Sequence, residues 1–199
     1  MSSKNLPKYF ESQKIKVPSL GLGTALITTD ISEAVYSSIK DGTRLIDTAA
    51  VYDSEEGVGK GVKKAIKEGI VKREDLFITT KLSKIEMTDP ESCIKKSLKK
   101  LDVDYIDLYL IHWPKFFDID NKGQKINITP LHKVWPLMES FVEKGYTKHI
   151  GVSNFNVQGL LNLLSFCKIK PLVNEIELHP YLYQKSLVEF CRREDILIF

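Results

Sequence analysis

The sequence predicts an α/β fold, an eight-stranded (β/α)8 TIM barrel that is incomplete within these 199 residues. Short β-rich runs alternate with longer amphipathic runs, which is the pattern of βα units around a parallel sheet. The seven predicted strands and six helices exceed a small doubly wound sheet, and no GxGxxG turn follows the first strand. Because such a barrel needs about 250 residues, we expect the chain to reach Phe199 before its barrel closes.

The predicted strands follow an amino-terminal β-hairpin near Tyr9–Val17, which we place at the bottom of the barrel. Each strand is a short run rich in residues that favour extended backbone. The seven strands are Leu20–Thr24, Leu45–Thr48, Leu76–Thr80, Ile106–Ile111, His149–Val152, Leu172–Ile176 and Ile196–Phe199.

The runs between the strands carry signals for the start and end of helices. Asp30 with Glu33 resembles a capping box, and Asp89 precedes a proline at a first helical position. Three glycines stand where helices should stop, namely Gly42, Gly69 and Gly145. No linker, internal repeat or low-complexity stretch divides the chain, so we expect residues 1–199 to form a single barrel domain, truncated at its carboxyl end.

The composition is that of a globular protein, with 43% hydrophobic residues, 28% charged residues and a net charge of +3. Lysine-rich runs alternate with apolar residues at helical spacing, as in Ile94–Leu101. We interpret these runs as solvated helix faces and expect no nucleic-acid partner. The amino terminus has no apolar leader core and no segment is long enough to span a bilayer, so we expect a cytoplasmic protein with no membrane partner.

The cysteine pattern predicts neither disulfides nor a metal site. Cys93, Cys167 and Cys191 lie far apart, in helix-like contexts. They form no CxxC pair, and none has a histidine at ligand spacing. We therefore interpret them as reduced, structural thiols.

Polar side chains follow the ends of several predicted strands, where barrels of this kind carry their chemistry. Asp47 ends the second strand, and Tyr52 lies close behind it. Lys81 ends the third strand, and His112 follows the fourth. Taken singly, each has a structural explanation, such as a bond to a helix amide or a satisfied core histidine. An acid, a phenol, an amine and an imidazole at consecutive strand ends favour one shared site instead.

This set of side chains suits the reduction of a carbonyl group. A ketone or aldehyde that accepts hydride develops negative charge on its oxygen, and a positioned proton donor lowers that barrier. Tyr52 is the predicted acid, and the Lys81 ammonium is expected to lower the pKa of its phenol. Asp47 can hold Lys81 in place, while His112 can orient the substrate oxygen by hydrogen bonding.

The order of these residues resembles the aldo-keto reductase family, aldose and aldehyde reductases in particular. The matching stretches are LGLGT (20–24), RLIDTAAVYDSEEGVG (44–59), ITTKL (78–82), LDVDYIDLYLIHWP (101–114), EKGYTKHIGVSNF (143–155) and NEIELHPYL (174–182). The resemblance implies an NADPH-dependent oxidoreductase whose catalytic tetrad is Asp47, Tyr52, Lys81 and His112, with Tyr52 as general acid. His112 favours carbonyl reduction, because the branch of the family that reduces carbon–carbon double bonds has glutamate there.

The resemblance also implies where the cofactor lies, NADPH by family preference and NADH as the other option. Thr24 and Asp47 would lie along the cofactor, and Ser153 and Asn154 would bind its carboxamide. Glu175 stands where relatives usually have glutamine. An ionised carboxylate only accepts hydrogen bonds, so Glu175 would receive the N–H of the carboxamide. The pyrophosphate loop and the basic cluster for a 2′-phosphate would lie beyond Phe199.

The substrate side is implied in the same way. Trp113 would line the pocket for a small carbonyl compound together with Tyr52 and His112, and the loop near Lys115–Thr129 would border it. Ala25 stands where many relatives have tryptophan, which should widen that pocket. The complete protein is expected to be a monomer.

Two other functions remain open at this point. A barrel of this family can be a catalytically incompetent cofactor-sensing or interaction subunit, similar to the cytoplasmic β-subunits of potassium channels, although those lack the histidine found at His112. The other possibility is a naturally shortened, non-catalytic product. Its open barrel would expose the edges of the first and last strands.

Overall fold

A single curled sheet of parallel strands forms the centre of the molecule. The computed structural model describes residues 8–83, 89–114, 118–120, 123–125 and 129–199. Its main sheet has seven strands in the order β11-β10-β9-β6-β5-β4-β3, and every neighbouring pair is parallel. The strands are β3 (Gly21–Gly23), β4 (Leu45–Asp47), β5 (Phe77–Leu82), β6 (Ile106–Ile111), β9 (Thr147–Ser153), β10 (Val173–Glu175) and β11 (Leu197–Ile198). This arrangement confirms the prediction of an incomplete (β/α)8 barrel.

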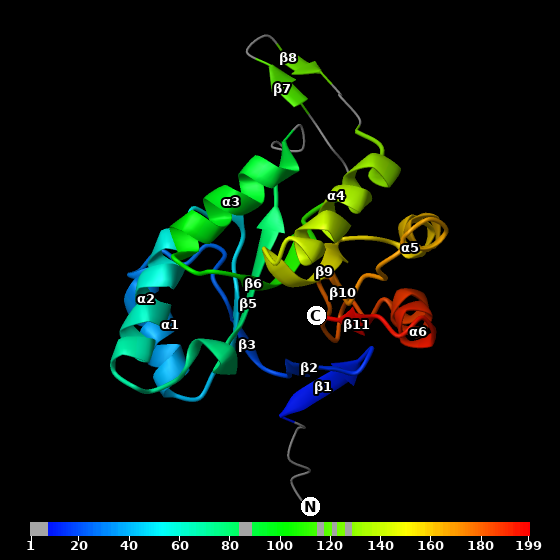
Figure 1. Cartoon of the computed structure of the whole chain (residues 1–199). Helices are drawn as coiled ribbons and strands as arrows, with labels where there is room; N and C mark the ends of the chain where they lie inside the picture. The colour runs from blue at the N-terminus through cyan, green and yellow to red at the C-terminus, as the bar shows by residue number, and fades with distance from the viewer. Residues whose placement is uncertain (1–7, 84–88, 115–117, 121–122, 126–128) are drawn as a thin grey trace, which may run out of the picture.

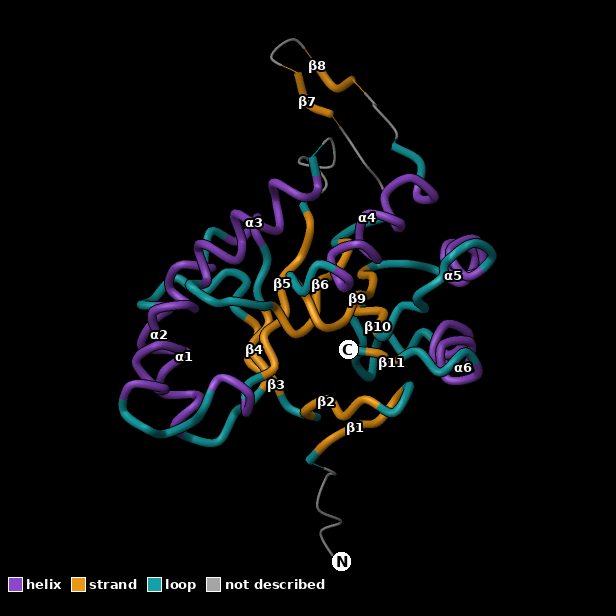
Figure 2. The backbone as a smooth tube through the Cα atoms, viewed as in Figure 1, coloured by secondary structure: helices purple, strands orange, loops and turns teal. Residues whose placement is uncertain are grey.

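Six α-helices cover the outer face of the sheet in the described part of the chain (Figure 1). They are α1 (Ile31–Lys40), α2 (Glu55–Lys67), α3 (Pro90–Leu101), α4 (Leu131–Glu143), α5 (Val157–Leu164) and α6 (Lys185–Arg193). Two short 3₁₀ turns, η1 (Ala50–Tyr52) and η2 (Arg73–Asp75), lie beside α2 in the sequence. The tube view shows the helices outside and the strands inside (Figure 2).

The helix boundaries confirm the predicted caps, although the Glu33 carboxylate bonds to Ser37 and Lys64 and does not complete a capping box with Asp30. The Asp30 carboxylate accepts hydrogen bonds from the first backbone N–H groups of α1, and Asp89 caps α3 ahead of its proline. All three predicted stop glycines have positive φ, between 73° and 108°, which residues with a side chain rarely adopt. Local capping chemistry therefore sets where these helices begin and end.

The hydrophobic core has two layers, one on each face of the sheet. The larger layer lies between the strands and the helices. The smaller layer fills the inside of the curl and consists of Val17, Leu45, Phe77, Leu108, Leu110, Leu172 and Val173. Because successive side chains of a strand point to opposite faces, this inner cluster identifies which residues of each strand point into the barrel.

The amino-terminal hairpin closes the bottom of the curl, as predicted. Its strands are β1 (Tyr9–Ser12) and β2 (Ile15–Pro18), which pair antiparallel. Val17 is fully buried in the inner cluster, and the Ser12 hydroxyl donates a 2.7 Å hydrogen bond to the backbone oxygen of Asp195. The hairpin therefore covers the amino-terminal ends of the strands and leaves their carboxyl ends for other contacts.

Two details of the predicted element map are corrected. Within the segment treated as a loop, 115–129, short strands β7 (Asp118–Asp120) and β8 (Gly123–Lys125) pair antiparallel. Strands of three residues that are rich in charge are too short to show the alternation of apolar and polar residues by which a strand is recognised in a sequence. The third predicted strand, Leu76–Thr80, extends as β5 through Leu82, so Lys81 lies inside a strand.

Two further expectations concern bilayers and thiols. Among the helices in the described ranges, none combines the length and apolar character needed to cross a bilayer. No disulfide joins Cys93, Cys167 and Cys191, in agreement with the predicted thiols.

Candidate active site

Alternation along the strands brings the predicted site residues to one place. Asp47 lies two residues after the inner residue Leu45, Lys81 lies four after Phe77, and both therefore point into the curl. By the same count His112 and Glu175 follow Leu110 and Val173. Asp47, Lys81 and Glu175 form a charged floor at the carboxyl ends of the strands, and His112 lies at the same end. We call this end of the sheet the mouth.

Lys81 is the centre of this floor. Its side chain is completely buried, and its Nζ lies 2.7 and 2.8 Å from the two carboxylate oxygens of Asp47. The same nitrogen lies 3.1 Å from the backbone oxygen of Thr48 and 3.1 Å from Glu175 Oε1. Burial alone disfavours an ammonium, but the two carboxylates outweigh it, and the pKa of Lys81 is raised. Lys81 is therefore held as a cation.

Glu175 contacts a cation of the protein, whereas the sequence suggested only a contact with the cofactor carboxamide. It forms an ion pair with Lys81, and its second oxygen, Oε2, is buried without a hydrogen-bond partner among the described residues. Burial and the neighbouring Asp47 carboxylate raise the pKa of Glu175 to about 7. The Lys81–Glu175 pair was not predicted, although the alternation of β5 and β10 would have placed both side chains inside the curl.

Tyr52 and His112 lie together above the charged floor. Tyr52 Oη is 3.4 Å from His112 Nε2, and either atom can donate, depending on the imidazole tautomer. Their rings meet edge to face with centres 5.6 Å apart, and Lys81 Nζ lies 5.1 Å from the centre of the Tyr52 ring. The structure thus brings all four predicted tetrad residues together.

One expectation about Tyr52 is wrong in direction. We expected Lys81 to hold the pKa of the phenol below its ordinary value. Burial raises the pKa of Tyr52 more than the Lys81 ammonium lowers it, and Asp47 and Glu175 raise it further. The phenol is therefore a weaker acid in this chain than a free tyrosine.

The residues predicted to bind a carboxamide lie on the neighbouring strand end. Asn154 has a left-handed backbone, with φ of 63°, and its Nδ2 donates to the His112 backbone oxygen at 3.0 Å and to Ser153 Oγ at 3.1 Å. Ser153 Oγ donates in turn to the Glu175 backbone oxygen at 3.0 Å. With its Nδ2 engaged, Asn154 presents Oδ1 as an acceptor, whereas Glu175 Oε2 is buried. The Asn154 acceptor fits a ligand that carries an amide N–H₂ group.

Thr24 and Trp113 lie at the margins of the same site. Thr24 is buried, and its hydroxyl donates to the Asp47 backbone oxygen at 3.0 Å and lies 3.0 Å from Ser54 Oγ, so it braces the end of β4. The Trp113 side chain is 46% exposed, and its ring lies nearly parallel to the His112 ring with centres 6.4 Å apart. An exposed indole beside the imidazole offers an apolar wall to a ligand.

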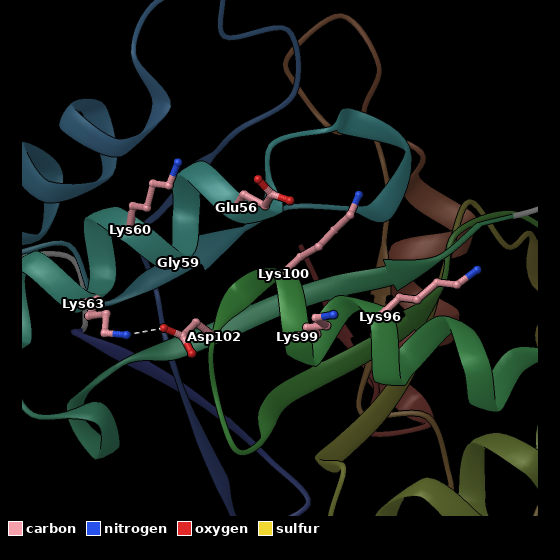
Figure 3. A pocket seen from close by; sticks show the side chains of 8 residues that line it. All are labelled: Glu56, Gly59, Lys60, Lys63, Lys96, Lys99, Lys100 and Asp102. Carbon is pink, nitrogen blue, oxygen red and sulfur yellow. Dashed lines mark hydrogen bonds and ion pairs between the residues drawn. The ribbon is translucent and has the colours of Figure 1, made fainter.

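A hollow lies away from this site, in the outer layer between α2 and α3. It measures about 580 Å³ and is lined by Glu56, Gly59, Lys60, Lys63, Lys96, Lys99, Lys100 and Asp102 (Figure 3). Lys63 bonds to Asp102 across it, and none of the predicted site residues reaches it. Its lysines come from the runs interpreted as solvated helix faces, which agrees with that interpretation.

No candidate metal centre was predicted, and none is evident in the described ranges. There, no three histidine, cysteine or acidic side chains are grouped so that they could hold a metal ion.

Comparison with known proteins identifies a family. Residues 19–199 match the Aldo/keto reductase family. Aldose reductase C of Dictyostelium discoideum is 41% identical over 202 residues, covering 91% of this chain and 62% of that protein. The NADH-dependent D-xylose reductase of Candida parapsilosis is 41% identical over 200 residues, covering 92% of this chain and 62% of that protein.

The fold matches solved structures equally well. The crystal structure of a Bombyx mori aldo-keto reductase in complex with NADP superposes with a TM-score of 0.88 at 37% identity, covering 96% of this chain and 64% of that one. The chain thus spans about 62% of the length of the curated relatives named above.

Proposed function

The chain belongs to the aldo/keto reductase family, and on that premise we propose that it forms the catalytic barrel of an oxidoreductase that reduces aldehydes or ketones to alcohols. The observation that carries this proposal is the meeting of Tyr52, His112, Lys81 and Asp47 at the mouth of the sheet. Four chemically different side chains from separate elements converge there around one buried ammonium.

Tyr52 is the proton donor in this proposal. A bound nicotinamide cofactor supplies the hydride. As negative charge develops on the carbonyl oxygen, Tyr52 Oη donates its proton to that oxygen, and His112 Nε2 lies close enough to share in holding it. The Lys81 ammonium stabilises the phenolate that Tyr52 becomes, because opposite charges attract strongly away from water.

Lys81 and Asp47 act through Tyr52. The two short contacts between Lys81 and Asp47 fix the ammonium beneath the phenol ring. This placement matters because burial works against ionisation of the phenol. Without Lys81 the proton would be harder still to release, so the ion pair is part of the proton-donating apparatus.

The carboxamide of the cofactor fits the acceptor described above. Asn154 Oδ1 would receive its N–H₂ group, Ser153 and Glu175 would complete this edge, and Asp47 with Thr24 would border the ribose side. We propose NADPH as the cofactor and NADH as the alternative, because the similar proteins include one bound to NADP and one named for NADH.

The substrate would be a small carbonyl compound held against Trp113, with Tyr52 and His112 below it. The exposed indole supplies apolar contact, while the two polar groups meet the carbonyl oxygen. We propose one barrel domain acting as a monomer, with no nucleic-acid partner.

Turnover and binding measured together test this proposal. Full-length protein that carries this chain is titrated with NADPH while tryptophan fluorescence is followed, and it is then assayed for NADPH oxidation with a panel of aldehydes and ketones. We expect binding and carbonyl-dependent oxidation. Binding without turnover on any carbonyl compound would contradict the proposal and favour a cofactor-sensing subunit.

A further inference from the structure

Two carboxylates share one buried ammonium at the mouth. Lys81 Nζ contacts Asp47 Oδ1 at 2.7 Å and Glu175 Oε1 at 3.1 Å. Asp47 binds with both oxygens, whereas Glu175 binds with one and leaves Oε2 buried and unpartnered. If both acids are ionised, this cluster has a net charge of −1, which water screens only in part because the side chains of Asp47 and Glu175 are 19% and 22% exposed.

Within the part of the chain that the structure describes, the surroundings of Glu175 bring no second cation to balance that charge. On the β9 side its strand partner is Ser153, which is neutral. On the β11 side, Leu197 and Ile198 pair with Val173 and Asn174, the two residues before Glu175, and both are apolar. The charged groups that face Glu175 among the described residues are therefore Lys81 on β5 and Asp47 on β4. Tyr52 responds to the same charges from η1.

We propose that Glu175 is a positioning residue for the proton donor: it holds Lys81 jointly with Asp47, and its own protonation decides how much of the Lys81 charge acts on Tyr52. This inference rests on the proposed function, because the acidity of Tyr52 matters only if Tyr52 donates a proton. It gives Glu175 a role that a glutamine in its place cannot perform, since an amide does not ionise.

The two states of Glu175 have opposite effects on the phenol. Protonated Glu175 is neutral and can donate a hydrogen bond to Asp47, so the cluster is balanced and Lys81 stabilises a phenolate at Tyr52. Ionised Glu175 adds a negative charge beside Lys81, which raises the pKa of Tyr52. Because the pKa of Glu175 is about 7, the protein would pass between these states near neutral pH.

The direction of the pH effect on catalysis follows. Below neutral pH, Glu175 is protonated and Tyr52 is the stronger acid, so reduction is faster. As the pH rises through about 7, Glu175 ionises, and kcat for reduction should fall. The Glu175→Gln variant should lose this descending limb of its pH profile.

A titration without cofactor or substrate tests the inference directly. Full-length protein is labelled with isotope-enriched tyrosine at Cζ, and the Tyr52 signal is assigned by its loss in Tyr52→Phe. The NMR signal is followed from acid to strongly alkaline pH in the unsubstituted protein, in Glu175→Gln and in Glu177→Gln. Glu177 is a matched control, because it lies two residues further on, with a side chain that is 73% exposed and far less buried than Glu175.

The expected result has two parts. In the unsubstituted protein the Tyr52 signal should show a small step near pH 7, the value at which Glu175 changes charge. In Glu175→Gln that step should be absent, and the phenol should ionise at lower pH than in the unsubstituted protein, while Glu177→Gln should match the unsubstituted protein. If Glu175→Gln does not fold, a step near pH 7 that persists in His112→Gln still decides the matter, because the His112 imidazole beside Tyr52 is also a titratable group.

The inference is overturned if the Tyr52 signal shows no step near pH 7 in the unsubstituted protein, or if Glu175→Gln leaves ionisation of the phenol unchanged. The proposed function fails separately, because it depends on turnover and this titration does not. A protein with the expected titration but no carbonyl reduction would sink the reductase proposal and leave the Lys81–Glu175 coupling in place.

Discussion

Two buried charge clusters lie at opposite ends of the same sheet, and their charges are reversed. At the bottom, the Asp107 carboxylate on β6 lies between two cations, with Arg73 Nη2 at 2.7 Å and Lys148 Nζ at 3.4 Å. It also accepts a hydrogen bond from the backbone N–H of Ile78 at 3.0 Å. At the mouth, the Lys81 ammonium lies between the carboxylates of Asp47 and Glu175.

The clusters differ in where the surplus charge lies. At the bottom the surplus belongs to Lys148, whose side chain is 47% exposed, so water screens it. At the mouth it belongs to Glu175, which is 22% exposed and has an oxygen without a partner. A buried surplus charge costs stability, and such costs are concentrated at sites that perform chemistry. We therefore expect the bottom cluster to hold the fold and the mouth cluster to serve the proposed reaction.

Removing the central cation of the mouth should have the largest effect on stability. Lys81→Met leaves two carboxylates facing each other without a cation, which should cost about 3–5 kcal/mol at mildly alkaline pH. Below about pH 5 the acids can take up protons, so the loss should be much smaller. Urea unfolding at both pH values, with Lys99→Met on the outer face of α3 as a control, measures this. A loss equal at both pH values would refute the account of the mouth.

Breaking the bottom cluster should separate stability from activity. Arg73→Met should lower the free energy of unfolding by about 2–4 kcal/mol, because Asp107 is nearly completely buried. Lys148→Met should cost less than about 1 kcal/mol, since Lys148 is half exposed. Chemical unfolding and kcat are measured on both variants. A drop in kcat for the folded Arg73→Met protein would show that the bottom also takes part in the reaction.

A smaller effect is expected from Glu175→Gln on the pH dependence of stability. Because the pKa of Glu175 rises from an ordinary 4.5 to about 7, the unsubstituted protein loses stability as the pH rises between these values. The variant lacks this loss and should be more stable by ~1–3 kcal/mol at mildly alkaline pH, with little difference at acidic pH. Melting temperatures across this range, with Glu177→Gln as a control, decide it. A variant less stable at alkaline pH would contradict the prediction.

Most of the fold was predictable because it depends on local patterns. Helix caps at Asp30 and Asp89 and the positive-φ glycines are decided within one turn of chain, so the sequence predicted them. The β7–β8 hairpin was missed because two three-residue strands show no readable alternation.

The sequence predicted which residues form the candidate site, but it did not predict how their pKa values are shifted. Motif order and strand ends located Asp47, Tyr52, Lys81 and His112, which the fold brings together. The direction of the Tyr52 pKa was wrong, because burial depends on packing from several elements and outweighs one neighbouring charge. The Lys81–Glu175 pair was missed because β5 and β10 are far apart in the sequence, and only the folded sheet brings the two side chains together.

The central claim, that the mouth is a proton-donating site built on Tyr52, is tested most directly by comparing Tyr52→Phe with Tyr105→Phe in steady-state carbonyl reduction. Tyr105 is the matched control, because its ring lies over Arg73 and Lys148 at the bottom of the sheet. We predict that Tyr52→Phe lowers kcat ~10²–10⁴-fold with cofactor affinity unchanged, while Tyr105→Phe leaves kcat unchanged. If Tyr52→Phe kept its kcat and only raised KM, the phenol would be a binding group, and the claim would be wrong.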